Sequence, residues 1–222
     1  MADPSGVIFY GDPHGQWQPL LEEYAHRSAR AVILLGDCEL ERPLRQVLEP
    51  IHADGCPVLW IHGNHDSDRT DWWENLTGAE GGLHGTVANL GGLRVAGLGG
   101  TYAGRAWYPK LGDEEPRFRT RRDWLQAIPR HERCGKELPL RKRAFSLPED
   151  HERLSLARAD VLVTHEAPTS HQHGFGALDD LARDVGARLV VHGHHHRGYT
   201  GWTRDGIPVR GLGLAECWRM EE

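Results

Sequence analysis

The stretch LVVHGHHHRG, residues 189–198, joins a short apolar run to four histidines in five positions, namely His192, His194, His195 and His196. A purification tag would lie at a terminus, and a metal-storage tract would lie in a low-complexity segment. This tract lies inside the chain, directly after a run typical of a buried strand. Alternate side chains of extended backbone share a face, so we expect His194 and His196 to point together and His195 elsewhere. The tract predicts two metal ligands at a strand end.

The same short apolar run recurs along the chain. Residues 6–11, 31–36, 58–63, 93–100, 160–165 and 189–193 have the pattern of buried strands. Between them, residues 16–30, 43–55, 149–159 and 176–187 have amphipathic patterns typical of helices, and the last is expected to end at Gly186. This alternation predicts an α/β fold with largely parallel strands. Residues 207–216 are expected to add a final antiparallel strand.

Residues 101–148 break this alternation, because they contain neither a clear strand nor a long regular helix. From Glu114 to Arg143 there are ten Lys or Arg residues against five Asp or Glu, a local charge of +5 in a chain whose net charge is -6. We interpret the segment as a basic insertion over one end of the sheet. The length of 222 residues otherwise indicates a single domain over 1–222.

Polar residues follow five of the six predicted strands at the point where each ends. Carboxyl ends of parallel strands meet along one edge of a sheet, so these segments are expected to meet in space. Carboxylate, amide and imidazole donors suit first-row divalent ions, and six or seven of them suit two ions that share a bridging carboxylate. The residues are Asp12, His14, Asp37, Asn64, His65, His165, His194 and His196.

Five blocks in this order resemble the calcineurin-like metallophosphoesterases: GDPHG (11–15), GDCEL (36–40), GNHD (63–66), THEAP (164–168) and GHHH (193–196). The resemblance spans residues 7–198 and implies a two-sheet mixed β-sandwich flanked by helices, with the metal site at the C-terminal ends of strands. It implies that one ion is held by Asp12, His14 and His196 and the second by Asn64, His165 and His194. Asp37 would bridge the two ions, and His65 would be the acid near the leaving group.

One block departs from some relatives. The Ser/Thr protein phosphatases continue it as G-D-x-x-D-R-G, whereas this chain reads GDCELER, with Leu40 in place of the second Asp and Arg42 displaced by one position. In those relatives that Asp orients the catalytic histidine. His65 must therefore find another partner, and we expect Asp66 or a backbone carbonyl. The departure argues against a protein phosphatase.

The predicted chemistry is hydrolysis of a phosphate ester. Two divalent ions lower the pKa of a water between them toward neutrality, so that hydroxide can attack phosphorus while His65 protonates the departing oxygen. Two oxygens on one carboxylate would let Asp37 reach both ions. Manganese is the first expectation, with iron, zinc, cobalt or nickel as alternatives. Phosphomonoesters and phosphodiesters both remain open, and the alternative is a non-catalytic metal-binding interaction module on the same fold.

No sequence motif identifies the residues that contact the substrate. Arg105, directly after a predicted strand, is the best single candidate for a phosphate contact. The arginines of the insertion are candidates for more distant phosphates, and Tyr102, Trp107 and Tyr108 for stacking on a base, which would suit a nucleotide. The alternative is that the basic segment is an ordinary solvated surface.

Composition narrows the partners further. The net charge of -6 argues against a general nucleic-acid or membrane partner. The first residues lack the basic and apolar regions of a secretory signal, and the four cysteines lack metal-binding spacing, so we expect free thiols in a cytoplasmic protein.

Overall fold

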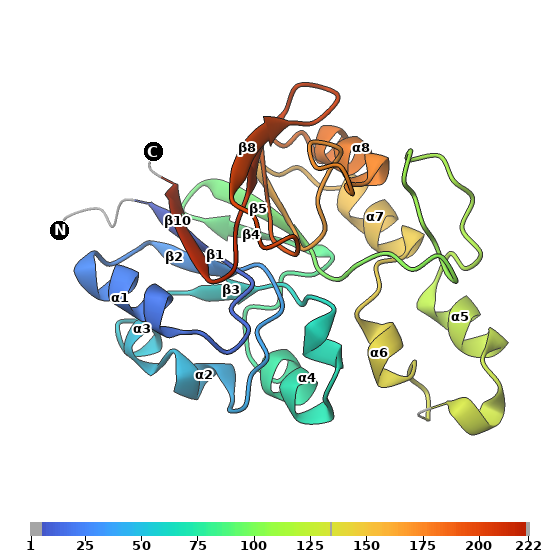
Figure 1. The fold of residues 1–222 in the computed structure, drawn as a ribbon, viewed down its shortest axis with the longest axis horizontal. Helices are drawn as coiled ribbons and strands as arrows, with labels where there is room; N and C mark the ends of the chain where they lie inside the picture. The colour runs from blue at the N-terminus through green and yellow to red at the C-terminus, as the bar shows by residue number, and fades with distance from the viewer. Residues whose placement is uncertain (1–5, 134, 221–222) are drawn as a thin grey trace.

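A computed structural model describes residues 6–133 and 135–220, which form two β-sheets packed face to face with helices outside them (Figure 1). The first sheet has the order β10-β1-β2-β3, in which β1, β2 and β3 run parallel and β10 is antiparallel to β1. Its strands are β1 (Val7–Gly11), β2 (Ala31–Leu34), β3 (Val58–Trp60) and β10 (Glu216–Met220).

The second sheet has the order β4-β5-β6-β7-β9-β8. Its four inner strands are parallel, and an antiparallel strand lies at each edge. The strands are β4 (Thr86–Leu90), β5 (Leu93–Leu98), β6 (Val161–Thr164), β7 (Leu189–His192), β8 (Tyr199–Trp202) and β9 (Pro208–Gly211).

The strands are continuously apolar because both faces of each sheet are covered. Phe9 and Ile33 of the first sheet pack with Val163 and Val191 of the second, and all four side chains are fully buried. On its outer face the first sheet packs against α1–α4, and the second sheet packs against α7 and α8. Such two-sided burial explains the uninterrupted runs of Val, Ile and Leu.

The helices are short. None in the described part of the chain is long and apolar enough to cross a membrane. As predicted, α8 ends at Gly186, whose φ of 73° lies in the left-handed region that glycine adopts readily. The helices are α1 (Gln18–His26), α2 (Leu44–Val47), α3 (Glu49–Ala53), η1 (His65–Ser67), α4 (Thr70–Thr77), α5 (Arg121–Ala127), η2 (Arg130–Glu132), α6 (Leu140–Arg143), α7 (Pro148–Ser155) and α8 (Gly176–Val185).

The predicted α/β sandwich is confirmed, but three details are wrong. The strand at residues 208–211, β9, is parallel to β7, and the final antiparallel strand is β10 on the other sheet. The expected helix over 43–55 is two helices, because Pro50 has no N–H to continue the first. The sequence patterns did not predict β4, β8 or α4.

The basic segment 101–148 contains α5, η2 and α6. Trp124, Ile128, Leu138 and Leu147 form a small apolar cluster of their own in this segment. In Figure 1 the segment lies beside α4 and α7, at the side of the molecule away from the two termini. A single domain with this insertion stays a prediction.

Candidate metal centre

The two sheets bring the predicted ligands together from five strand ends. The ligand atoms of Asp12, His14, Asp37 and His196 all lie within 4.8 Å of one another. Those of Asp37, His165 and His194 form a second such group. Asp37 is therefore common to both groups, in the position that a bridging ligand would require.

Individual distances define the arrangement. The Nε2 atoms of His14 and His196 are 3.0 Å apart, and His165 Nε2 lies 3.2 Å from Asn64 Oδ1. Asp37 Oδ2 lies 3.4 Å from His165 Nε2 and 3.7 Å from His14 Nε2. All seven predicted ligands thus share one small volume.

The two oxygens of Asp37 have different surroundings. Oδ1 accepts a 2.8 Å hydrogen bond from the backbone N–H of His65. Oδ2 is buried and has no hydrogen-bond partner in the described residues. An unsatisfied buried carboxylate oxygen is unfavourable unless a charged group meets it. Oδ1 keeps a second lone pair beside its one hydrogen bond, so the bridging of two ions by Asp37 stays a prediction.

Two of the imidazoles are oriented by partners behind them. His165 Nδ1–H donates to the Leu35 carbonyl over 2.7 Å, and His14 Nδ1 lies 2.6 Å from Glu39 Oε1. Each bond leaves the lone pair of Nε2 facing the cluster, which is the usual arrangement of a metal-binding histidine. Sequence reasoning missed Glu39, although it lies only two residues after Asp37. With the unsatisfied Asp37 Oδ2, these free nitrogens fit divalent cations.

The backbone of the site is unusual. Positive φ angles occur at five predicted ligands, although left-handed backbone is disfavoured for residues other than glycine. The values are 42° at Asp12, 42° at His14, 52° at Asp37, 69° at His194 and 51° at His196. Glu39 and Ala215 are the two other described non-glycine residues with positive φ, and the Ala215 N–H donates to the Asp12 carbonyl. The left-handed backbone is therefore concentrated at the site.

Two glycines allow this close packing. A Cβ atom at Gly63 would lie 2.1 Å from Asp37 Oδ1, and one at Gly193 would lie 2.6 Å from Asp12 Oδ2. Real Cβ atoms do not approach oxygens so closely. The glycine before Asn64 and the glycine before His194 are therefore required by the carboxylates packed against them.

Asp66 does not orient His65, so that prediction is wrong. Its buried carboxylate accepts the backbone N–H groups of Asp37, Cys38, Glu39 and Gly63 at 2.7–3.2 Å. Burial, reinforced by the nearby Asp37 charge, raises the pKa of Asp66 to about 6. Asp66 thus holds together the two loops that present Asp37 and Asn64.

His65 is instead bonded to Asp68. Its Nδ1 lies 2.8 Å from Asp68 Oδ2, and its ring centroid lies 5.4 Å from that of His14. Burial alone would lower the pKa of His65, but the hydrogen bond to Asp68 and the charge of Asp37 outweigh it and raise the pKa. Since 46% of the His65 side chain is exposed, the ring lies at the mouth of the cluster.

Burial and charge also act strongly at the centre of the cluster. Burial raises the pKa of Asp12 to about 7, and repulsion by Asp37 contributes to the shift. Burial would lower the pKa of His165, but the carboxylates of Asp37 and Asp12 raise it to about 10. Without a cation, a protonated His165 supplies the positive charge that these carboxylates favour, and a bound cation would take over that role and leave Nε2 as a ligand.

Other histidines lie near the cluster with different contacts. His192 is fully buried, and its Nε2 is 2.7 Å from the Tyr199 hydroxyl, so it is not available as a ligand. His195 stacks on His171 with ring centroids 3.8 Å apart, and its ring also lies 4.9 Å from that of His194. Glu166, His194 and His195 form a third close group of donor atoms. Burial raises the pKa of the Cys38 thiol well above its usual range, so the thiol stays protonated.

The residues predicted to contact the substrate differ in their exposure. Tyr102 and Trp107 are buried and pack against each other and against His151, so the expectation that they stack on a base is wrong. Tyr108 is half exposed. Arg105 lies exposed on a turn, and no hydrogen bond or ion pair joins it to the described residues. Its phosphate contact stays a prediction.

Comparisons with known proteins agree with this geometry. A family model described as calcineurin-like phosphoesterase matches residues 6–198. An uncharacterized protein from Haemophilus influenzae is 35% identical over 211 residues, which cover 94% of this chain and 91% of that protein.

Two solved structures share the fold at low sequence identity. A Thermus thermophilus protein superposes with a TM-score of 0.62 at 15% identity over 99% of both chains. The 5'-nucleotidase from Candida albicans has a TM-score of 0.51 at 14% identity, over 97% of this chain and 47% of that one. With the family match covering most of its length, the chain belongs to the calcineurin-like phosphoesterase family.

Proposed function

We propose that this phosphoesterase is a hydrolase that needs two divalent cations and acts on small phosphate esters. Asp12, His14, Asp37 and His196 would hold one cation, and Asp37, Asn64, His165 and His194 the other. The observation that carries the proposal is the unsatisfied, buried Oδ2 of Asp37, which lies 3.4 Å from a nitrogen of one group and 3.7 Å from a nitrogen of the other.

Bound divalent cations, with manganese as the first choice, supply Lewis acidity toward phosphoryl oxygens and lower the pKa of water. The protein's own residues supply the rest. Asp68 holds His65 by Nδ1, which leaves Nε2 to carry a proton toward the ester oxygen that departs. The raised pKa of His65 favours the protonated form that this role needs. Glu39 and the Leu35 carbonyl fix the rings of His14 and His165.

The position of the site favours small esters among the substrates of phosphoesterases. The exposed His65 and the shared position of Asp37 suit an ester that reaches the cluster from solvent. A nucleotide is one candidate, because the fold is shared with a 5'-nucleotidase. Arg105 is the proposed contact for a further substrate phosphate.

The test compares hydrolysis of p-nitrophenyl phosphate and bis-p-nitrophenyl phosphate by metal-stripped protein with and without added manganese. Turnover that appears with manganese and disappears with EDTA is expected, and the better of the two esters identifies a monoesterase or a diesterase. Metal binding without turnover of either ester would favour a non-catalytic interaction module.

A further inference from the structure

A cavity of about 1000 Å³ lies between the end of β3, α4 and the basic insertion. Its lining includes Trp60 at the end of β3, His62 two residues further on, Trp73 from α4, and residues of α5, α6 and α7. None of the seven candidate metal ligands lines it. Binding pockets for small molecules have volumes of roughly 300–1,000 Å³, so this cavity is large enough for a ligand.

Flat rings form the inner wall of the cavity. The His62 ring lies 5.3 Å from the Trp73 ring in an edge contact and 4.6 Å from the His84 ring. Trp60 and Leu125 complete this wall. Ring systems of this kind recognise other flat rings by stacking and edge contacts.

His62 is a buried part of this wall, with its ring edge-on to that of Trp73. The residue is 5% exposed, and its Nε2 has no hydrogen-bond partner in the described residues.

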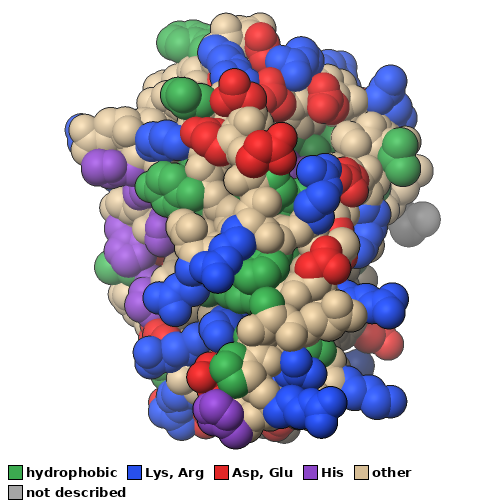
Figure 2. All heavy atoms as spheres, turned by 90° about the vertical axis from the view of Figure 1, so that its right-hand side faces the viewer, with side chains coloured by type: hydrophobic (Ala, Val, Ile, Leu, Met, Phe, Trp, Pro, Cys, Tyr) green, Lys and Arg blue, Asp and Glu red, His purple; other side chains and the backbone are tan. Residues whose placement is uncertain are grey.

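Cations without partners lie on the outer wall. Arg121 in the same cavity is paired with Asp150 at 2.7 Å and Arg143 with Glu137 at 2.7 Å. In contrast, Arg122, Lys136 and Arg153 have no ion pair within residues 6–133 and 135–220, and each is exposed. Among the carboxylates of the lining, Glu149 also pairs with Arg121 at 2.9 Å, which leaves Glu74 as the one without an ion pair in the described residues. Figure 2, which faces the insertion, shows Lys and Arg side chains crowded over the lower half of this side. The rim therefore favours an anion.

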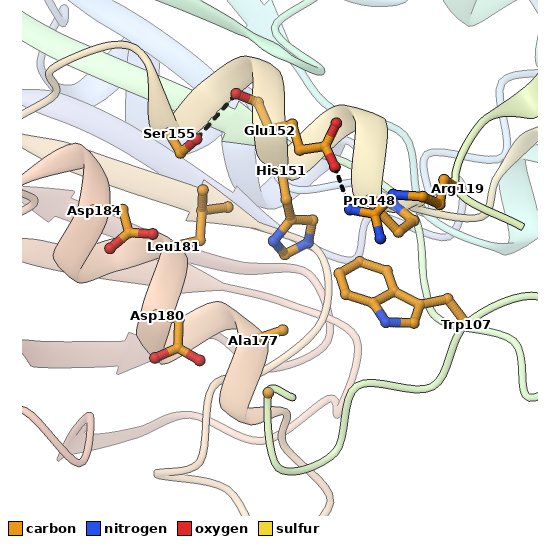
Figure 3. Close-up of a pocket in the computed structure, with 11 residues that line it drawn as sticks. Trp107, Arg119, Pro148, His151, Glu152, Ser155, Ala177, Asp180, Leu181 and Asp184 are labelled. Carbon is orange, nitrogen blue, oxygen red and sulfur yellow. Dashed lines mark hydrogen bonds and ion pairs between the residues drawn. The ribbon is translucent and has the colours of Figure 1, made fainter. Parts of the chain in front are cut away.

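A second cavity provides a contrast. It has a volume of about 250 Å³ and lies between α7 and α8, where the rings of Trp107 and His151 face acidic side chains (Figure 3). Its single arginine, Arg119, is paired with Glu152 at 2.7 Å, and the aspartates that line it are paired with arginines outside the lining, Asp180 with Arg204 at 2.6 Å and Asp184 with Arg183 at 3.5 Å. That cavity has rings, but its lining holds no cation without an ion pair, so it does not favour anions.

We propose that the 1000 Å³ cavity is a binding site, separate from the metal centre, for a small anion that carries a flat aromatic ring, such as a nucleoside monophosphate. The ring lies against Trp73 and His62, and the anionic group lies toward Arg122 and Arg153. The basic insertion thereby has a role that a solvated surface would not have. The proposal does not depend on hydrolysis at the metal centre.

The test is calorimetric titration of the full chain with AMP in EDTA, with adenosine and inorganic phosphate as the two half-ligands. AMP is expected to bind more tightly than either half-ligand. Reversing two rim charges in the double variant Arg122→Glu, Arg153→Glu is expected to weaken AMP binding about tenfold or more. Trp73→Leu tests the ring contact, and thermal unfolding of each variant checks that it folds.

Two controls fix the location. The double variant Arg130→Glu, Arg133→Glu makes the same charge change in the same insertion outside the cavity lining, and Asp37→Asn alters the metal centre. Both are expected to leave AMP affinity unchanged. The proposal is overturned if AMP does not bind, or if the double variant and wild type bind it equally. Loss of binding in Asp37→Asn would also overturn it, by placing AMP in the metal centre, whereas manganese-dependent ester hydrolysis tests the proposed function separately.

Discussion

His65 Nδ1 and Asp68 Oδ2 lie 2.8 Å apart, and they join the first residue of the short helix η1 to the residue that follows its end. Asp68 also lies 3.4 Å from Arg141 Nε at the start of α6. In the Ser/Thr protein phosphatases the catalytic histidine is oriented by an Asp at the position that Leu40 holds here. In this chain Asp68, three residues after His65, is bonded to that histidine instead. The consequence is that the orientation of His65 depends on η1 and on the insertion that packs against it.

Asp68→Asn is expected to lower kcat for alkyl phosphate esters by roughly tenfold, because an amide holds the His65 ring less firmly and does not favour its protonated form. p-Nitrophenyl esters, whose leaving group needs little protonation, are expected to change less. Steady-state rates on both ester types provide the measurement. Asp71→Asn, a nearby exposed carboxylate paired with Arg69, is the control. Unchanged alkyl ester rates would remove Asp68 from this role.

His65→Asn removes the acid itself. Turnover of esters with poor leaving groups is expected to fall by roughly 10²–10⁴-fold, while manganese content stays at the wild-type level. Rates on a series of leaving groups and elemental analysis of the same samples check both parts. Equal losses on p-nitrophenyl and alkyl esters would show that His65 does not protonate the leaving group.

Asp37→Ala and Asn64→Ala are expected to abolish activity because they deplete the bound metal. Asp37 Oδ2 is the unsatisfied oxygen common to both groups, and Asn64 Oδ1 contacts His165. Elemental analysis after dialysis measures the loss. His131→Ala, an exposed histidine of the insertion, is the control and should retain full occupancy. Full occupancy in both site variants would show that the ligand assignment is mistaken.

Gly63→Ala is expected to destabilise the fold by about 1–3 kcal/mol and to weaken metal binding, because its Cβ would lie 2.1 Å from Asp37 Oδ1. Gly104→Ala is the matched control, since nothing lies within 4 Å of a Cβ there and its φ is not positive. Urea unfolding of the two variants measures the difference. Equal stabilities would mean that the loop moves aside freely.

His151 predicts a pH dependence of stability. Burial lowers its pKa to about 4, below the unfolded value of 6.5. Between these values the unfolded chain takes up a proton that the folded protein does not, so the free energy of unfolding falls as the pH falls from 6.5 toward 4. His151→Gln removes this contribution, which is on the order of 2 kcal/mol. Urea unfolding at pH 7 and pH 4.5 should show a smaller loss in the variant than in wild type. An identical loss would contradict the assignment.

The positions of the seven candidate ligands were predictable because each follows an apolar run that ends a strand. Parallel strands bring such positions to one edge whatever the details of the loops. The partners behind the ligands were not predictable. Glu39 and Asp68 lie within three residues of Asp37 and His65, but their contacts depend on left-handed and helical backbone that no glycine marks.

The pairing of strands that are distant in the sequence was also not predictable. The order of strands around β9 and β10 depends on which sheet each one joins, and the local pattern of residues 207–216 does not contain that information. Tyr102 and Trp107 had the composition of a base-stacking pair, yet they pack in the core beside His151. Whether an aromatic residue in an irregular segment is buried or exposed depends on its contacts with helices that are distant in the sequence.

The antiparallel pairing of β1 with β10 sets an order of events during synthesis on the ribosome. Gly11 is opposite Glu216, and the Asp12 carbonyl accepts from Ala215 N–H. Of the described elements, β10 leaves the ribosome last, so the loop that carries Asp12 gains its final neighbour only when all the others have emerged. A cation held by Asp12 would therefore meet the completed loop only after β10 has paired with β1.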